Sequence, residues 1–542
     1  TRELGLTKKE TKYIFVLGGV MSGLGKGIAA SSIGYLLKQA GVKATIMKLD
    51  PYLNIDPGTM NPYQHGEVFV LDDGSETDLD LGHYERFIDV NMTKNNNATS
   101  GQIYSTVLDR ERKGEYLGET VQVIPHVTDE IKKRIKILNK DKEYEVVICE
   151  VGGTVGDIES LPFMEAIRQL SLEVGYHNHM FVHVTLLPYI KASGELKSKP
   201  TQHSVMKLRE IGLSPDMILC RSEHPIEQSV REKIALFCNV RTDHVIEGRD
   251  VPSIYEVPLS MHEQNAGLLI KKRLKINKVP KLKKLKSFIK SYKNPEKEVT
   301  IAMCGKYTEL IDSYKSVMES FVHAGVENNA RVNVKWVKTE KIKSKSSAQK
   351  EFFGVDGILL LPGFGIRGAE GKIKSSKYAR ETRVPFLGIC LGLQCAVIDY
   401  ARNVCGLIDA NSTEFNKNTK YPVINLMESQ RAIKIKGGTM RLGAYNCDIT
   451  PGTKTFKAYK RKQISERHRH RYEVNNKYRN ILEENGLIFS GLNTKLGVVE
   501  SIEIAEHPWF VASQFHPELK SRVNKAHPLF REFIKASINN KI

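Results

Sequence analysis

The sequence has 542 residues, 41% of them hydrophobic, and it carries a formal net charge of +19. A chain of this length exceeds what one hydrophobic core supports, which predicts two or three domains. It contains no apolar run of about eighteen residues, and its first residues are charged, so we expect neither a transmembrane helix nor a secretory signal. The eight cysteines have no framework or zinc-ligand spacing, which predicts reduced cysteines in a cytoplasmic protein without a membrane partner.

The excess of positive charge is concentrated in one short segment. Residues 271–298 contain twelve Lys/Arg against two Glu, so this stretch supplies +10 of the net +19. A basic surface can bind nucleic acid, but a charge run of this kind is more simply a solvated interdomain segment, and we expect no nucleic-acid partner. The segment predicts the domain boundaries: a first domain at 1–272, a Lys-rich linker at 273–298 and a second domain at 299–542.

Short apolar strands alternate with helical stretches on both sides of this segment. In the first half the sequence predicts a helix at 26–40 and strands at 13–17, 44–47, 145–149, 181–187 and 217–219. In the second half it predicts a helix from residue 391 and strands at 299–303, 332–337, 357–361 and 385–389. This alternation of short apolar strands and helices is typical of a mostly parallel sheet that helices cover on both faces. The predicted fold class is α/β, with two doubly wound, mostly parallel domains.

A glycine-rich loop lies between the first strand and the first helix. Gly18 to Gly27 reads Gly-Gly-Val-Met-Ser-Gly-Leu-Gly-Lys-Gly. At this position backbone N–H groups, the helix N-terminus and Lys26 favour phosphate binding. The loop is not a standard Walker A motif, because Gly27 stands where Ser or Thr would coordinate magnesium. The sequence therefore predicts a P-loop-type, Rossmann-like first domain in which Mg²⁺ needs other ligands.

Two carboxylates are candidates for that metal. Glu150 directly follows a predicted strand, so it lies at the carboxyl edge of the sheet, where ligands bind. Asp78 lies in the acidic stretch from Glu76 to Leu81. Mg²⁺ prefers hard oxygen donors, usually one or two carboxylates with phosphates and water. Either residue would serve equally well as a helix cap or a solvated acid.

A series of sequence blocks surrounds these residues across nearly the whole first half: Lys48 to Tyr52, Gln64 to Val70, Glu76 to Phe87, Val121 to His126, Glu150 to Ser160 and Lys197 to Gln202. In sequence and in order these blocks resemble the CTP synthase family. The resemblance implies that ATP phosphorylates the 4-oxygen of UTP and that ammonia then displaces the phosphate to give CTP. It implies Mg²⁺ with ATP as the cofactor and no organic prosthetic group.

Carried over to matching positions, the resemblance implies a set of binding residues. Those for ATP are Gly23, Leu24, Gly25, Lys26, Gly27, Ile28, Asp78, Arg249, Asp250 and Val251. Those for UTP and CTP are Ser22, Asp157, Ile158, Glu159, Lys197, Ser198, Lys199, Pro200, Thr201, Gln202 and Lys233. Asp78 and Glu150 would hold the metal, and Lys26 and Lys48 would offset the charge that develops during phosphoryl transfer.

In the second half a cysteine follows an apolar strand. Cys390 stands between glycines in Leu-Gly-Ile-Cys-Leu-Gly and ahead of a helix, as at a nucleophile elbow. Further along, Ser513 to Glu518 reads Ser-Gln-Phe-His-Pro-Glu. On an extended strand His516 and Glu518 would face one way, so that His516 activates Cys390 while Glu518 orients the imidazole.

These features resemble a class I glutamine amidotransferase domain, a flavodoxin-like fold, from about Val299 to Phe530. The resemblance implies that Cys390 attacks the side-chain amide of glutamine, forms a glutamyl thioester and releases ammonia. Leu361 to Gly365 offers backbone N–H groups for an oxyanion hole, although Pro362 stands where the family usually has a glycine. The residues implied to hold glutamine are Gly363, Leu391, Gly392, Leu393, Gln394, Glu414 and Arg471.

Residues Arg467 to Arg471 alternate Arg and His, which predicts a strand with arginines on one face and histidines on the other. We expect Arg471 to pair with the α-carboxylate of glutamine. Cys395 follows the nucleophile along the helix and is expected in the core.

Together the halves predict a ligase of pyrimidine biosynthesis that uses UTP, ATP and L-glutamine. The resemblance further implies activation by GTP, inhibition by CTP and a homotetramer. Three alternatives remain: an ATP-dependent amidotransferase acting on a cofactor acid, a P-loop ATPase that serves as a partitioning or scaffold protein, and an RNA-binding protein. The lysines from Lys281 to Lys286 would carry the last of these, whereas a scaffold has no use for the cysteine site.

Overall fold

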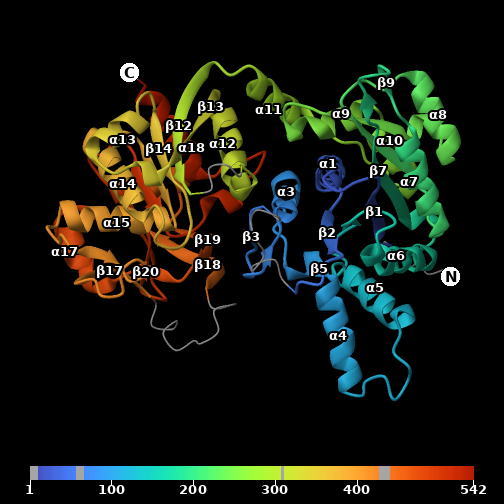
Figure 1. Ribbon diagram of the computed structural model, residues 1–542, viewed down its shortest axis with the longest axis horizontal. Coiled ribbons are helices and arrows are strands. Elements are labelled where there is room, and N and C mark those ends of the chain that lie inside the picture. Colours follow the sequence, from blue (N-terminus) through green and yellow to red (C-terminus); the bar gives the residue numbers. More distant parts are fainter. Residues whose placement is uncertain (1–9, 56–65, 307–310, 427–439, 542) are drawn as a thin grey trace, which may run out of the picture. The chain divides into compact units, whose positions relative to one another are not determined.

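The computed structural model describes residues 10–55, 66–306, 311–426 and 440–541. By their internal contacts they divide into two compact units (Figure 1). Unit 1 comprises Thr1–Pro57 and Asp80–Ile289, and unit 2 comprises Gly58–Leu79 and Lys290–Ile542. The boundary between Ile289 and Lys290 lies inside the Lys-rich segment 273–298. The short segment 58–79 groups with unit 2, although it lies between two parts of unit 1 in the sequence.

Unit 1 is built on a seven-stranded sheet in the order β11-β10-β7-β1-β6-β2-β5, and all of its strand pairs are parallel. The strands are β1 (Lys12–Gly18), β2 (Ala44–Asp50), β5 (Asn97–Thr99), β6 (Val146–Val151), β7 (His179–Leu186), β10 (Met217–Ser222) and β11 (Val245–Arg249). A small hairpin, β8 (Tyr189–Ile190) and β9 (Glu195–Leu196), lies outside this sheet. The central strands are buried throughout, as continuous apolar runs in parallel sheets require.

Helices cover both faces of this sheet. Side chains of α4, α5 and α6 pack with Phe15 and Leu17 of β1 on one face, and α1 contacts β2, β6 and α9 on the other. The helices are α1 (Lys26–Gln39), α3 (Leu79–Ile88), α4 (Ser100–Arg112), α5 (Thr128–Ile137), α6 (Leu161–Val174), α7 (Lys199–Glu210), α8 (Gln228–Cys238), α9 (Val257–Glu263), α10 (Ala266–Leu274) and α11 (Lys283–Lys293). Within the Lys-rich segment, α11 buries Leu285, Phe288 and Ile289.

Unit 2 is built on a nine-stranded sheet in the order β13-β12-β14-β15-β23-β22-β21-β18-β19. Its first five strands are parallel and the others antiparallel. They are β12 (Lys297–Gly305), β13 (Ala330–Lys338), β14 (Gly357–Leu360), β15 (Phe386–Ile389), β18 (Arg441–Ile449), β19 (Gln463–His470), β21 (Leu487–Asn493), β22 (Val498–Ile504) and β23 (Phe510–Ser513). A smaller sheet holds β16 (Ala410–Ser412), β17 (Tyr421–Leu426) and β20 (Tyr472–Val474), and segment 58–79 contributes the hairpin β3 (Phe69–Val70) and β4 (Glu76–Thr77).

The helices of unit 2 also lie on both faces of its large sheet. Residues of α12 and α18 pack with Ile301 and Met303, whereas residues of α13, α14 and α15 pack with Ala302 and Cys304. The helices are α12 (Lys315–Glu327), α13 (Lys345–Glu351), α14 (Ala369–Thr382), α15 (Leu391–Asn403), α16 (Lys454–Tyr459), α17 (Arg479–Glu484) and α18 (Pro528–Asn539). The predicted α/β class with two doubly wound domains is confirmed. The sheet of unit 1 is parallel throughout, whereas the sheet of unit 2 has four parallel and four antiparallel strand pairs.

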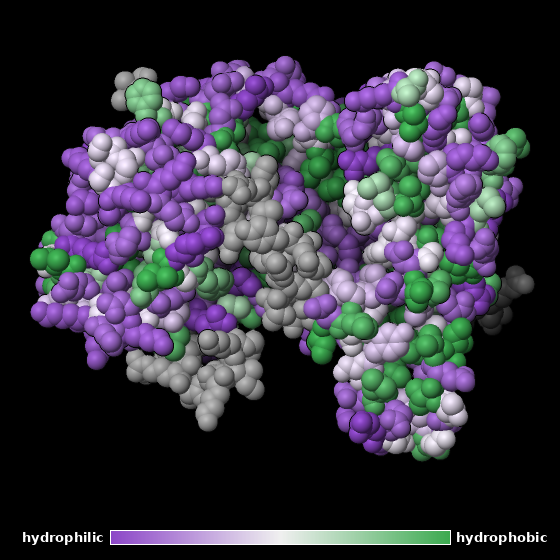
Figure 2. All heavy atoms as spheres, viewed as in Figure 1, coloured by the Kyte–Doolittle hydropathy of each residue, from purple (hydrophilic) through white to green (hydrophobic). Residues whose placement is uncertain are grey.

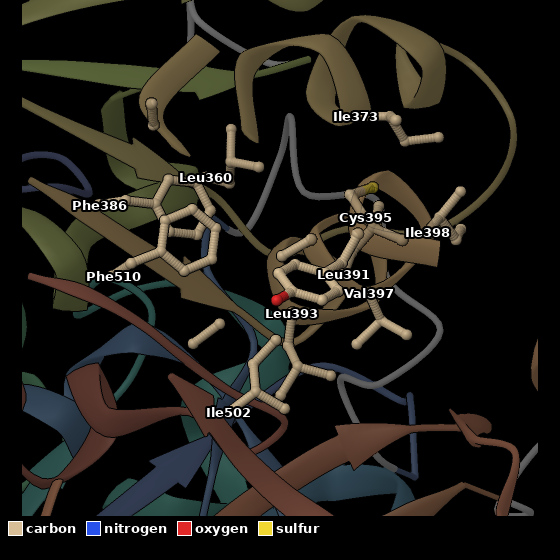
Figure 3. Packing of buried hydrophobic residues seen from close by; sticks show 14 of the residues in the cluster. Leu360, Ile373, Phe386, Leu391, Leu393, Cys395, Val397, Ile398, Ile502 and Phe510 are labelled. Carbon is tan, nitrogen blue, oxygen red and sulfur yellow. The ribbon is translucent and has the colours of Figure 1, made fainter. Parts of the chain in front are cut away.

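The core beneath α15 holds the strand that precedes the predicted nucleophile. Phe386 of β15 stacks on Phe510 of β23 with ring centroids 4.3 Å apart, and the first residues of α15 pack nearby (Figure 3). Cys395 is fully buried in this cluster, as expected. All eight cysteines are free, and seven of them are buried.

Most of the face seen in Figure 2 is polar or charged. Apolar side chains gather around α4 and the segment after it, where Leu108, Leu117, Val123 and Ile124 are exposed. Among the described residues no helix combines the length and the apolar character needed to cross a bilayer.

Replacing Phe386 by Ala should destabilise unit 2 by about 3–5 kcal/mol, because it opens a cavity and removes the stacked partner of Phe510. Denaturant unfolding followed by tryptophan fluorescence measures this loss, since Trp336 and Trp509, the two tryptophans of the chain, both lie in unit 2. Phe353 is 83% exposed, so Phe353→Ala is the control and should change the unfolding free energy by less than about 0.5 kcal/mol. Equal effects of the two variants would contradict the described packing.

Candidate functional sites

The glycine-rich loop connects β1 to the N-terminus of α1, as predicted. Gly23 and Gly25 adopt φ angles of 74° and 86°, a left-handed conformation that favours glycine. Helix α1 begins at Lys26, whose side chain is buried and whose Nζ donates to the carbonyl of Gly153 at 2.7 Å. Burial lowers the pKa of Lys26. The loop therefore presents a helix N-terminus and an amine at the carboxyl edge of the sheet, which suits a phosphate.

A buried cluster of charges lies beside this loop. Lys48 Nζ donates to Glu150 Oε1 at 2.8 Å and also to Asp80, and the Tyr84 hydroxyl donates to Glu150 Oε2. Burial, opposed by Lys48, raises the pKa of Glu150. Asp80 was not among the predicted site residues. Asp80 lies in the acidic stretch from Glu76 to Leu81, and no sequence pattern distinguishes it from the other acidic residues there.

The donor set of this cluster fits Mg²⁺. A Cβ on residue 27 would overlap Asp80 Oδ1 and lie 3.4 Å from Glu150 Oε2, so Gly27 leaves room where carboxylate oxygens face the phosphate loop. Among the described residues no group of three or more His, Cys, Asp or Glu side chains could hold a metal alone, so an ion here would also need phosphate or water oxygens. Asp78 directly follows β4 in unit 2, and its part in a metal site stays a prediction.

Several residues predicted to bind ATP meet in one cavity of unit 1. It has a volume of about 260 Å³ and lies between the phosphate loop, β11 and α9. Predicted residues that line it are Leu24, Gly25, Ile28, Arg249, Asp250 and Val251. Arg221, which was not predicted, also lines the cavity and links its two sides, because it donates to Gly23 O at 3.1 Å and to Asp250 Oδ1 at 3.0 Å.

The residues predicted to bind UTP and CTP are spread over several segments of unit 1. Ser22 and Lys233 are exposed. Asp157 Oδ2 accepts from the N–H of Thr154 at 2.7 Å, and it precedes the short turn Ile158–Ser160, which contains Glu159 and in which Ile158 is 80% exposed. Their role in binding stays a prediction.

The block from Lys197 to Gln202 forms the start of α7. Lys197 pairs with Glu195 at the surface, and helix α7 begins at Lys199 and Pro200. Three residues of this block, Ser198, Thr201 and Gln202, are buried and form hydrogen bonds within unit 1. Thr201 Oγ1 donates to Leu186 O at 3.1 Å, and Gln202 Nε2 donates to Ser198 Oγ at 2.9 Å.

In unit 2, Cys390 occupies a sharp turn between β15 and α15. Its φ of 54° and ψ of −102° are sparsely populated for a residue with a side chain, and its N–H donates to Ser513 O at 2.7 Å. The Gln514 side chain, unassigned from the sequence, donates from Nε2 to Cys390 Sγ at 3.7 Å. This geometry matches the predicted nucleophile elbow.

His516 and Glu518 lie together beside the cysteine. His516 Nδ1 and Glu518 Oε1 are 2.7 Å apart, and both side chains are buried. Burial opposes protonation, but Glu518 and Cys390 outweigh it and raise the pKa of His516 to about 10. The expectation of an extended strand was wrong here: β23 ends at Ser513, and Pro517–Lys520 is a 3-10 helix, because Pro517 fits the first helical position.

The predicted oxyanion loop follows β14. Gly365 N–H donates to Glu414 Oε1 at 2.6 Å. This hydrogen bond connects the loop to Glu414, which is also predicted to bind the substrate glutamine. Burial raises the pKa of Glu414, and the charge of Arg471 acts in the opposite direction. Gly363 and Pro362 line the same cavity as Cys390. The remaining predicted residues, Leu391, Gly392, Leu393 and Gln394, form the first turn of α15.

That cavity, of about 230 Å³, is also lined by a segment that the sequence did not link to it. Gly66, Glu67, Val68 and Val70 share its walls with Cys390, His516, Glu518 and Phe364. The 66–79 hairpin segment is held by ion pairs: Arg467 Nε to Asp72 Oδ1 at 2.5 Å, and Arg469 Nε to Glu76 Oε1 at 2.7 Å. Although burial opposes them, Arg467 and Lys520 lower the pKa of Asp72. Nothing in the acidic sequence 72–80 distinguishes residues that pair with arginine from residues that bind a metal.

Comparisons with known proteins match both halves of the chain. The family model described as CTP synthase N-terminus matches residues 12–276, and the model described as glutamine amidotransferase class-I matches residues 309–536. The curated CTP synthase of Caldanaerobacter subterraneus subsp. tengcongensis is 58% identical over 532 residues, covering 98% of this chain and 99% of the relative. That of Methanocaldococcus jannaschii is 56% identical over 540 residues, covering 98% and 100%. A solved structure, the Trypanosoma brucei CTPS glutaminase domain with bound acivicin, is 37% identical, covers 44% of this chain and 94% of its own, and has a TM-score of 0.42.

Replacing Glu518 by Gln should slow alkylation of Cys390 by iodoacetamide about tenfold near pH 7. The carboxylate raises the pKa of His516, so the imidazolium that favours the thiolate is present at neutral pH and is lost as the pH rises towards about 10. Without that charge the imidazole deprotonates at lower pH. Mass spectrometry of the peptide that contains Cys390 measures the rate against pH.

Glu466→Gln is the matched control, because Glu466 is another buried carboxylate with a histidine partner, His527 Nε2 at 3.1 Å. It should leave the alkylation profile unchanged. An unchanged profile in Glu518→Gln would contradict the role given to this pair.

Proposed function

Because the chain belongs to the CTP synthase family, and is therefore an enzyme of glutamine-dependent CTP synthesis from UTP, we propose that it performs this synthesis with two separate sites. Unit 2 releases ammonia from L-glutamine, and unit 1 uses ATP to install the ammonia on UTP. The observation that carries the proposal is the Cys390, His516 and Glu518 constellation in a chain that also has a phosphate loop with a buried Lys–carboxylate cluster.

In unit 2, Cys390 Sγ attacks the amide carbon of glutamine, and the carbonyl oxygen becomes an oxyanion near the N–H groups of the Gly363 loop. The His516 imidazolium gives its proton to the leaving nitrogen, and ammonia departs to leave a glutamyl thioester. His516, now neutral, takes a proton from water, whose oxygen attacks the thioester carbon and releases glutamate and the thiolate. Arg471 and Glu414 are proposed to hold the α-carboxylate and the α-ammonium of the substrate.

In unit 1, the 4-oxygen of UTP attacks the γ-phosphorus of ATP, and ADP leaves. Ammonia then attacks C4 of the pyrimidine and phosphate departs, which gives CTP after loss of a proton. Lys26 at the helix N-terminus and Lys48 between its two carboxylates supply positive charge at the phosphates. Glu150 and Asp78 would hold Mg²⁺, which when bound neutralises charge on the phosphate oxygens.

The finer parts of the proposal rest on the family resemblance. We include in it activation by GTP, feedback inhibition by CTP, assembly into a homotetramer and a cytoplasmic location. The cavity lined by the phosphate loop and Arg249 to Val251 supports ATP binding at that place. A cofactor acid as acceptor and a partitioning role have no support from the family matches, which cover both halves of the chain.

Cys390→Ala should abolish CTP formation with glutamine as the nitrogen donor, by at least about a thousandfold, because no other nucleophile forms the thioester. CTP formation with added ammonium should remain within about threefold of the parent. The absorbance change on conversion of UTP to CTP measures both rates. Loss of both activities in a folded variant would contradict the separation into two sites.

Glu150→Gln should remove CTP formation from glutamine and from ammonium alike, because the charge that faces Lys48 and the phosphate loop is lost. Glutamine hydrolysis, followed as glutamate release, should persist. Glu85→Gln is a control, since Glu85 is a fully buried carboxyl that accepts from Met92 N–H at 2.7 Å. Ammonium-dependent synthesis retained in Glu150→Gln would refute the role assigned to Glu150.

A further inference from the structure

A lysine that the reaction described above does not use is buried behind the predicted oxyanion loop of unit 2. Lys372 lies near the start of α14, and its side chain is fully buried. Among the described residues it forms no ion pair with Asp or Glu, and its Nζ donates to one acceptor, the Leu361 carbonyl oxygen, at 2.5 Å. Leu361 is the residue at which the loop begins.

An ammonium group in such a position costs folding free energy. Lysine side chains are almost never fully buried unless a partner compensates their charge, because the interior solvates an ion poorly. In keeping with this cost, burial lowers the pKa of Lys372 to about 8. An unbranched apolar side chain of similar length would fill the same space without the cost. The amine at residue 372 is therefore better explained by what it contacts than by the stability of unit 2.

Helix α14, which carries this lysine, is held firmly in unit 2. A Cβ on residue 371 would lie 1.8 Å from Thr339 O, so glycine at this position lets the helix pack directly against that backbone. Ile373, the next residue after Lys372, belongs to the core cluster shown in Figure 3. Further along the helix, Arg380 Nε pairs with the buried Asp399 of α15 at 3.1 Å. The amine therefore extends from a base that does not shift easily.

The contact with Lys372 fixes the beginning of the oxyanion loop. The Leu361 carbonyl precedes Pro362, whose ring restricts its φ angle to about −65°. A Cβ built on residue 363 would lie 3.9 Å from Lys372 Nζ, so the amine also lies beside the backbone of Gly363. With one carbonyl held and the next φ restricted, the direction in which the chain reaches Gly363 is largely set. Pro362, which stands where the family usually has a glycine, thus makes this loop stiffer.

The other end of the loop is fixed by a second lysine and a carboxylate. Lys306 Nζ donates to the carbonyl oxygens of Phe364 and Gly365, to the latter at 3.1 Å. The N–H of Gly365 points away from the Phe364 carbonyl, as in any trans peptide unit, and donates to Glu414 Oε1 at 2.6 Å. Both ends of the loop are therefore held by side chains that contact its backbone polar groups.

Two backbone donors remain between these fixed ends. Within the part of the chain that the structure describes, the N–H groups of Gly363 and Phe364 donate to no acceptor. Both residues line the cavity that also contains Cys390. Pro362 has no N–H to offer, and that of Gly365 is already used. The N–H groups of Gly363 and Phe364 are therefore the donors that the loop can present to an oxyanion.

We propose that Lys372 is a positioning residue for the release of ammonia from glutamine. By holding the Leu361 carbonyl, it keeps the N–H groups of Gly363 and Phe364 directed at the carbonyl oxygen of the substrate. That oxygen takes up negative charge when Cys390 Sγ attacks the amide carbon, and donors already in place stabilise it without reorientation. Lys372 touches neither the substrate nor the nucleophile in this role. The inference rests on the glutaminase activity proposed for unit 2.

Alkylation of the cysteine separates this role from two others. Iodoacetamide reacts with the Cys390 thiolate by displacement at a saturated carbon, so the reaction forms no oxyanion at the loop. If the charge of Lys372 served the thiolate, its loss would slow alkylation and hydrolysis together. If Lys372 only stabilised the fold, its loss would disturb the whole site, and KM and alkylation would change with kcat. A residue that positions the oxyanion loop affects kcat alone.

The test is Lys372→Met, which removes the amine and keeps the length of the side chain. The kcat of glutamine hydrolysis should fall about tenfold, with KM changed less than about threefold. The rate at which iodoacetamide alkylates Cys390 should stay within about twofold of the parent. Glutamate release measures kcat and KM, and mass spectrometry of the peptide that contains Cys390 measures alkylation.

Lys374→Met is the matched control on the same helix. Lys374 Nζ also donates to a backbone carbonyl, but to that of Lys343, at 2.6 Å, which lies outside the oxyanion loop. This variant should keep the kcat, the KM and the alkylation rate of the parent. Tryptophan fluorescence establishes that each variant is folded, and CTP synthesis with added ammonium should be unchanged in both because it does not use the cysteine site.

The proposal is overturned if Lys372→Met hydrolyses glutamine like the parent, or if alkylation slows as much as hydrolysis. It is also overturned if KM rises as much as kcat falls. Should Lys372→Met fail to fold, Lys372→Gln, whose side chain is one bond shorter, removes the same contact and is judged by the same rates. A parent enzyme that does not hydrolyse glutamine would contradict the proposed function itself, whereas an unaffected variant of an active parent contradicts only this inference.

Discussion

The cysteine site of unit 2 depends on the strained backbone of Cys390. A φ of 54° with a ψ of −102° costs on the order of 1–3 kcal/mol and persists only where neighbouring contacts enforce it. Here the hydrogen bond to Ser513 joins the turn to β23, and the two flanking glycines let the chain pack closely. A Cβ at residue 392 would lie 2.7 Å from Leu360 O, and one at residue 388 would lie 2.9 Å from the Gly392 carbonyl carbon. Close packing at this turn therefore requires glycine at residues 388 and 392, in addition to the role of the Gly-Ile-Cys-Leu-Gly pattern as a sequence motif.

Strand β19 contacts both the 66–79 hairpin segment and the backbone of His516. Its arginines point towards the 66–79 hairpin segment, where Arg467 and Arg469 pair with Asp72 and Glu76. Its histidines point into the interior. The backbone between them serves the site directly, since Arg467 O accepts from the N–H of His516 at 2.8 Å. One alternating strand thus fixes the backbone of His516 and, through its ion pairs, the hairpin segment that forms one wall of the cavity.

Much of this arrangement follows from patterns along the chain. Apolar runs predicted the central strands, because a parallel sheet buried on both faces leaves no polar positions. The turns before Lys26 and at Cys390 were predictable, because phosphate binding and a nucleophile elbow both require a strand–turn–helix junction with glycines. The family resemblance is confirmed by matches over 98% of the chain.

Other features depend on contacts between residues far apart in the sequence. The placement of residues 66–79 against β19 rests on ion pairs such as Asp72 with Arg467, which no local pattern reveals. Asp80 and Asp78 are equivalent by composition, and only the fold joins Asp80 to Lys48. The alternation of Arg and His from Arg467 to Arg471 predicted the two faces of β19. The side chains that contact His468 and His470 come from β18, β20 and β22, which the sequence pattern does not reveal.

The proposed two-site function requires that nitrogen released at Cys390 is installed on UTP by the same enzyme. Mass spectrometry of CTP made from UTP, ATP, Mg²⁺ and glutamine labelled with ¹⁵N at the side-chain amide tests it most directly. We expect CTP that carries the ¹⁵N label, formed together with ADP and phosphate in equal amounts. Unlabelled CTP, or release of labelled ammonia with no formation of CTP, would contradict it.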